Sequence, residues 1–144
     1  MSIEQNKEVV RQMVEELFNR GNLSRADEFV AADFIENEEL PPGIPSGREG
    51  LTQLLTAMHS AFPDFQATIK DIIAEGDKVA LHQTFSGTHQ GEFMGIPPTG
   101  NRVSWGAFDI IRVAGGKCAE HWGLMDNMGM MQQLGAIPAP GEGG

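Results

Sequence analysis

The residues best suited to proton transfer lie in two neighbouring stretches in the second half of the chain. Asp109 stands in the run Trp105-Gly106-Ala107-Phe108-Asp109-Ile110-Ile111, which is otherwise apolar. If Asp109 faces inward, in phase with Trp105, its carboxylate is costly to desolvate, and that cost favours the protonated form near neutral pH. Asp109 is therefore a candidate acid or base. The alternative is that it faces outward and pairs with a Lys or Arg, since a bulge can shift the phase of a strand.

His121 is the natural partner of that carboxylate. It lies in Glu120-His121-Trp122-Gly123, and a turn at Ala114-Gly115-Gly116-Lys117 would fold this stretch back beside Asp109. A carboxylate that orients and charges an imidazole is the standard arrangement for moving protons. A single histidine in a strand can equally be a hydrogen-bonded structural residue.

Glu36 and Asn37 close a short extended piece just before the irregular segment 38–45, which contains three prolines. This segment cannot be helical, and it is apolar enough to be a loop that covers another part of the molecule. Glu36 would then lie at the mouth or wall of a cavity and contact a ligand, or it would be a plain surface carboxylate.

The remaining candidates would contact substrate rather than move protons. Trp105, Trp122 and Met125 could form apolar walls, although methionines at helical spacing can also be ordinary core residues. Asp126 fits the N-cap position of a last helix and could also touch a ligand.

Several motifs of known chemistry are absent from the sequence. It has no phosphate-binding glycine loop, no dinucleotide fingerprint and no nucleophile elbow. Its histidines, at positions 59, 82, 89 and 121, form no close pair at metal-ligand spacing. We therefore expect no metal site. His82 alternates with Leu81 and Gln83, which predicts that it lies on the outer face of the sheet.

The elements that must position these residues change from helices to strands along the chain. Apolar residues at helical spacing predict a helix that begins at Ser2, with Gln5 completing a capping box, and ends at Gly21. Shorter helical signals follow from Ser24 and from Ser46. After Pro63 the apolar period becomes two, which predicts strands around 67–73, 79–85, 103–113 and beyond 117, before a last helix through Leu134.

This order predicts an α+β fold: N-terminal helices packed on a strongly curved antiparallel sheet, forming a cone with an internal pocket. We expect one domain over residues 1–137 and a frayed tail over 138–144, which contains three glycines.

Composition limits the possible partners. The net charge of −10, with no basic cluster, argues against nucleic acid. The start of the chain is charged, and no apolar run approaches the roughly 18 residues of a membrane span. The only cysteine, Cys118, cannot form an intrachain disulfide. We expect a cytoplasmic protein.

Three segments resemble the SnoaL-like polyketide (ester) cyclases, which share the nuclear-transport-factor-2-like cone fold. They are Thr88–Gly100 (Thr-His-Gln-Gly-Glu-Phe-Met-Gly-Ile-Pro-Pro-Thr-Gly), Gly116–Trp122, and Gln133-Leu134-Gly135 following Asp126. The likeness covers nearly the whole chain. It implies a hydrophobic cavity, no cofactor and a homodimer or higher homo-oligomer. The family's type members close a ring in a polyketide methyl ester by an intramolecular aldol reaction, which needs a base and an acid.

The chain departs from the family pattern at the site itself. In the type cyclases the acid/base carboxylate stands two residues after the histidine that matches His121, and this chain has Gly123 there. The type members also carry a histidine where Asp109 stands and an asparagine where Glu36 stands. Asp109 could have taken over the acid/base role, with Asp109 and Glu36 sharing a proton in one dry cavity. The departure could equally mean that ring closure is lost.

The leading hypothesis is a cofactor-independent enzyme that acts on a hydrophobic carbonyl compound, by aldol cyclisation or a related isomerisation. Asp109 would be the base, and His121 the orienting or protonating partner. The alternatives are a non-catalytic binding protein for an apolar small molecule, an epoxide hydrolase-like enzyme on the same fold, and a scaffold that dimerises through its open sheet face.

Overall fold

The computed structural model describes residues 2–138, which fold into helices packed on one five-stranded sheet. The helical elements are α1 (Ile3–Met13), the π-helix η1 (Val14–Asn19), the 3-10 helix η2 (Leu23–Arg25), α2 (Ala26–Phe29), α3 (Gly47–Ala61) and α4 (Asn127–Gln133). The strands are β1 (Val30–Glu36), β2 (Gln66–Glu75), β3 (Lys78–Thr88), β4 (Arg102–Ala114) and β5 (Lys117–Met125). The predicted α+β class is confirmed. The tail expected to fray is 138–144, and all of it except Pro138 lies outside the described residues.

The sheet has the strand order β1-β5-β4-β3-β2. Strands β2 to β5 form the predicted antiparallel meander. The expectation of a wholly antiparallel sheet is wrong at one edge, because β1 pairs with β5 in parallel. Since β1 and β2 are opposite edges, the chain between them, with α3, must cross the whole width of the sheet. This crossing places the first strand beside the last.

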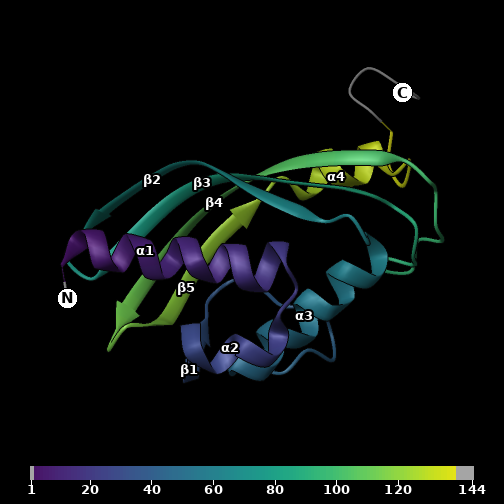
Figure 1. Ribbon diagram of the computed structural model, residues 1–144. Coiled ribbons are helices and arrows are strands. Elements are labelled where there is room, and N and C mark those ends of the chain that lie inside the picture. Colours follow the sequence, from purple (N-terminus) through teal and green to yellow (C-terminus); the bar gives the residue numbers. More distant parts are fainter. Residues whose placement is uncertain (1, 139–144) are drawn as a thin grey trace.

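The long strands curve over the helices (Figure 1). Strands β2, β3 and β4 arch above α1, while α2 and α3 lie near β1 at the other end of the sheet. Along β4, buried and exposed residues alternate from Val103 to Val113. The buried set faces the helices, and its Trp105 ring packs among Phe62, Phe65 and Phe85. The concave face of the sheet is therefore the inner face.

The predicted helix ends are mostly confirmed. Ser2 caps α1 in a capping box, accepting from the Gln5 backbone N–H at 3.1 Å while its own N–H donates to the Gln5 side chain at 2.8 Å. Gly21 follows with φ at +69°, a conformation that glycine adopts without strain. Ser46 precedes α3, although its side chain makes no capping hydrogen bond.

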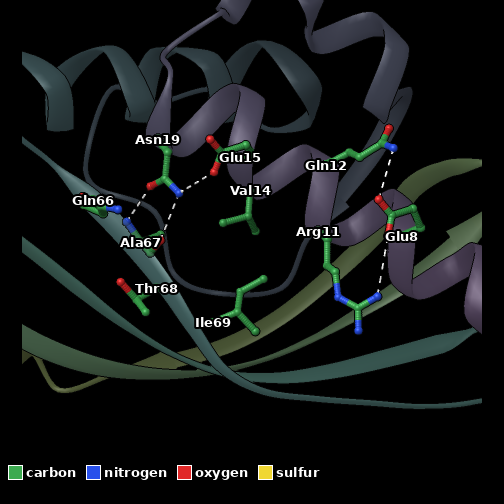
Figure 2. Close-up of a pocket in the computed structure, with 10 residues that line it drawn as sticks. All are labelled: Glu8, Arg11, Gln12, Val14, Glu15, Asn19, Gln66, Ala67, Thr68 and Ile69. Carbon is green, nitrogen blue, oxygen red and sulfur yellow. Dashed lines mark hydrogen bonds and ion pairs between the residues drawn. The ribbon is translucent and has the colours of Figure 1, made fainter.

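One side-chain pairing ties the helical layer to the sheet. Asn19 Oδ1 accepts from the Ala67 N–H at 2.6 Å, and its Nδ2 donates to the Ala67 carbonyl at 3.0 Å. Figure 2 shows this pairing at the wall of a surface hollow between α1, η1 and the start of β2. A second hollow lies between α2 and α3, near Arg48. None of the candidate site residues predicted from the sequence lines either hollow.

Candidate active site

Four polar side chains from four strands form one hydrogen-bonded row on the inner face of the sheet. Glu36 Oε1 lies 2.6 Å from His121 Nδ1, and Asp109 Oδ1 lies 2.7 Å from His121 Nε2. Asp109 Oδ2 accepts a hydrogen bond from Gln83 Nε2 at 2.8 Å. The row thus runs through β1, β5, β4 and β3. The predicted contact between His121 and Asp109 is confirmed.

Strand register explains why these residues meet. Glu36 lies directly opposite His121 in the parallel β1–β5 pair. In the antiparallel β4–β5 pair Asp109 is opposite Gly123, so His121 is its diagonal neighbour two residues away. Diagonal neighbours are within reach of longer side chains. Gln83 stands diagonally from Asp109 in the same way, because it pairs with Ala107.

Gly123 provides the space in which the two side chains meet. A Cβ added to Gly123 would lie 2.6 Å from Asp109 Oδ1 and 2.7 Å from His121 Nε2. Its backbone φ is not in the left-handed region, so glycine is not needed there for conformation. The Asp109 carboxylate therefore fills the space that a side chain at position 123 would occupy.

The row is withdrawn from solvent, and this sets the charge of His121. The side chains of Glu36 and Asp109 are each 9% exposed, and that of His121 is 16% exposed. Burial is the largest effect on the ring and disfavours its charge. The hydrogen bonds and charges of Asp109 and Glu36 outweigh burial and raise the pKa of His121 to about 10. His121 is thus an imidazolium at neutral pH, and it separates two carboxylates that we expected to share a proton directly.

The segment after β1 is fastened to the same site. The backbone N–H of Asn37 donates to the His121 carbonyl at 3.0 Å, and its side chain donates to Glu120. The backbone N–H of Glu38 donates to Glu36 Oε1 at 2.9 Å. Burial raises the pKa of the half-buried Glu38 carboxyl; the positive charge of His121 opposes this shift, and the nearby carboxylates of Glu36 and Asp109 add to it.

Glu38 and Gln83 are the site residues that sequence reasoning missed. Gln83 shares the inward phase of Leu81 in the predicted strand, and a polar residue at an inward position was the available signal. It is 3% exposed, and its Oε1 has no hydrogen-bond partner among residues 2–138. Trp105 Nε1, on the same inner face, is likewise buried without a partner in this range.

The other predicted contact residues divide between the two faces of the sheet. Trp105 and Met125 are on the inner face, Trp105 within the aromatic core and Met125 at the end of β5, paired with Ala107. Placing Trp122 in the pocket wall was wrong, because residues adjacent in a strand point to opposite faces. Trp122 pairs with exposed Ile110, and Lys78 lies over its ring at 5.2 Å.

Asp126 takes its predicted structural role. Its Oδ1 accepts from the Gly129 N–H at 2.9 Å at the start of α4, and the residue is exposed. His82 lies on the outer face as predicted, stacked on Phe108 with ring centroids 4.5 Å apart. Among residues 2–138 no group of three or more side chains is arranged to hold a metal ion.

The sequence and fold of this chain match those of known proteins. Residues 8–134 match the family described as SnoaL-like polyketide cyclase. The chain belongs to this family. It is 30% identical to the nogalonic acid methyl ester cyclase of Streptomyces nogalater over 120 residues, which cover 82% of this chain and 89% of that protein. It is 32% identical to the aklanonic acid methyl ester cyclase DnrD of Streptomyces peucetius, with 89% of each chain covered.

The solved structure of TsrD from Streptomyces laurentii has the same fold. It superposes with a TM-score of 0.86 at 29% identity, covering 95% of this chain and 99% of that one. The family membership and the fold that the sequence resemblance implied are therefore confirmed.

Replacing Gly123 with Ala tests the steric role of this glycine. The added methyl group would push Asp109 or His121 aside, so we expect the pKa of the His121 ring to fall by about one to two units, because an opposite charge at contact is worth that much. The measurement is a titration of the ring by NMR. Gly106→Ala on β4 is the matched control, because nothing lies within 4 Å of a Cβ at that position. An unchanged His121 titration in the Gly123 variant would contradict the assignment.

The charge of His121 should also appear in the pH dependence of stability. Its pKa is raised from 6.5 to about 10 on folding, so its contribution is complete below pH 6.5 and is lost as pH rises towards 10. We expect the free energy of unfolding, measured in urea, to fall over this range in the wild type. The fall should be smaller in His121→Gln. Parallel curves for the two proteins would show that the folded protein does not hold the extra proton on His121.

Proposed function

We propose that this chain is a cofactor-independent acid/base cyclase that closes a ring in a hydrophobic polyketide ester by an intramolecular aldol reaction. The observation that carries the proposal is the Glu36–His121–Asp109 row, which places a charged imidazole and two carboxylates on the inner face of a family cyclase fold. The relatives named as methyl ester cyclases support the reaction class.

Asp109 is the base in this proposal. It removes a proton from a carbon flanked by carbonyl groups, and the electron pair left on that carbon attacks a second carbonyl in the same molecule. A new C–C bond forms, and the attacked oxygen takes a proton to become a hydroxyl. His121 holds Asp109 in place through the 2.7 Å contact and balances its charge. Glu36 holds the other ring nitrogen and fixes the orientation of the imidazole.

The inner face beside this row is the proposed substrate pocket. Two buried polar atoms point to an oxygenated substrate: Gln83 Oε1 is a free acceptor, and Trp105 Nε1 is a free donor, among the described residues. Buried polar groups are normally paired, and one left alone costs about 1–3 kcal/mol. A substrate hydroxyl and a substrate carbonyl would supply the missing partners.

A purely binding role explains the site less well. A carrier of apolar molecules gains nothing from a buried row of charged groups, whose desolvation is costly. The epoxide hydrolase-like alternative shares the acid/base chemistry, but the relatives are named cyclases, which favours ring closure.

Asp109→Asn tests the proposal with the two esters named for the relatives, nogalonic acid methyl ester and aklanonic acid methyl ester. We expect the wild type to cyclise at least one of them, and the variant to lose about 10²- to 10⁴-fold in kcat because the general base is gone. Product formation by chromatography and ligand affinity by calorimetry are the measurements. Asp33→Asn, an exposed change on β1, is the control. Wild-type turnover in Asp109→Asn would reject the role, and unchanged affinity without any wild-type turnover would favour the carrier.

The outer face of the sheet supports a homodimer. Two adjacent cross-strand rows there carry apolar side chains. One row is Ile73, Ala80, Ile110 and Trp122, and the other is His82, Phe108 and Leu124. Phe108 is 66% exposed and Leu124 80% exposed. A second copy related by a twofold axis would bring the same apolar rows and cover both.

Phe108→Lys tests this interface. We expect the wild type to sediment as a dimer, and the variant as a monomer because a buried unpaired ammonium is strongly disfavoured. Ile3→Lys, an equally apolar exposed site at the start of α1, should leave the dimer intact. A monomeric wild type would reject the dimer, and a dimeric Phe108 variant would place its interface elsewhere.

Cys118 fits a cytoplasmic location. It is buried on β5, and burial raises the pKa of its thiol to about 12, so it stays in the unreactive thiol form. Among residues 2–138 no helix is long and apolar enough to cross a bilayer.

A further inference from the structure

The proposed aldol reaction removes a proton from carbon and delivers a proton to the oxygen that ring closure creates. His121 is an imidazolium, and its two ring protons point to Glu36 and Asp109. Glu36 Oε1 accepts both from His121 and from the Glu38 backbone N–H. Asp109 Oδ1 accepts from His121, and Oδ2 from Gln83. In the resting site both carboxylates are therefore held as hydrogen-bond acceptors, and Asp109 gains a proton to give only after it has taken one from carbon. A second carboxylic acid would allow both proton transfers in one step.

Glu38 is placed to be this second acid. It is the second residue of the segment that follows β1, and the Asn37 and Glu38 backbone N–H groups fasten this segment to His121 and Glu36. The Glu38 side chain is half-buried, and its carboxyl has no hydrogen-bond or ion-pair partner among residues 2–138. The next residue, Glu39, is exposed.

The charges around Glu38 favour its neutral form. The titratable groups that act on it are His121 on β5, Glu36 on β1 and Asp109 on β4. One imidazolium and two carboxylates leave a net charge of −1 beside a partly desolvated group. Ionising Glu38 would make this net charge −2. Protonating Glu38 breaks no hydrogen bond, because no donor among the described residues contacts its carboxyl oxygens. Of the three carboxyls, Glu38 is the one free both to hold a proton and to release it.

We infer that Glu38 is the general acid of the reaction, donating its proton to the oxygen formed when the new C–C bond closes. The inference rests on the proposed function, in which Asp109 takes the carbon-bound proton. As the attacked C=O bond breaks to a single bond, its electron pair takes the Glu38 proton. The carboxylate left on Glu38 is reprotonated from solvent, and Asp109 returns its proton to solvent. The substrate is isomerised, and no oxidant or reductant is used.

Kinetics with the two methyl esters test the role directly. Glu38→Gln should lose at least about 100-fold in kcat, and Glu38→Asp should recover part of that loss because it restores a proton donor. The matched control is Glu39→Gln, the same change on the neighbouring residue, and it should keep wild-type kcat. In the wild type kcat should fall as pH rises and Glu38 ionises, and this limb should be missing from the Glu38→Gln profile. Unchanged kcat and pH profile in Glu38→Gln would overturn the inference.

A titration that needs no turnover tests the placement of Glu38. At the alkaline pH where His121 loses its proton, Glu38 is ionised and stabilises the imidazolium. Glu38→Gln removes that charge, so the NMR titration of His121 should shift to lower pH, while Glu39→Gln should shift it much less. Equal titrations in the two variants would overturn the inference. If Asp109→Asn abolishes turnover but Glu38→Gln does not, this inference fails and the proposed function stands; if Asp109→Asn is fully active, the proposed function fails.

Discussion

The contact between one buried imidazolium and two carboxylates constrains the rest of this structure. Charges withdrawn from water are costly, and a pair or triad survives only when every contact is well made. His121 meets this requirement because its two nitrogens reach Glu36 at 2.6 Å and Asp109 at 2.7 Å from opposite sides. That arrangement needs a strand on each side of β5. The parallel pairing of β1 with β5 is thus both a feature of the topology and the means by which the second carboxylate reaches the ring.

The same constraint explains the departure from the family pattern at Gly123. The resemblance to the type cyclases implies an acid at this position, two residues after the matching histidine. Here the carboxylate comes from Asp109, directly across the β4–β5 pair, and it fills the space that a Gly123 side chain would take. Either strand can supply a carboxylate to this point beside the imidazole, but the 2.6 Å separation leaves room for only one. Asp109 and Gly123 are therefore one coupled feature of the sequence.

Local patterns in the sequence predicted the parts of the site that depend on a single strand or hairpin. The alternation around Trp105 favoured the inward phase of Asp109, which the structure confirms, and the glycine turn at 114–117 brought His121 beside it. The same alternation rules out Trp122 as a pocket wall, since it follows His121 directly. The contact of Glu36 with His121 was not predictable in this way, because it depends on strand pairing between residues 85 positions apart in the sequence. Glu38 was missed for a related reason: its half-buried position is created by that long-range pairing, and nothing in the proline-rich segment indicates it.

The division between a fixed row and a fastened loop also suits the chemistry. Within the row each group restrains its neighbour, which gives the positional accuracy that proton abstraction from carbon requires. Asp109 must release its proton after each cycle, and it can do so only by breaking one of its contacts in this network. An acid on irregular backbone at the edge of the site, attached through main-chain hydrogen bonds that leave its carboxyl free, has no such contact to break. The Glu38 backbone N–H is hydrogen-bonded to Glu36, while its side chain contacts no described hydrogen-bond partner. Glu38 is therefore held beside the row with a carboxyl that is free to exchange its proton.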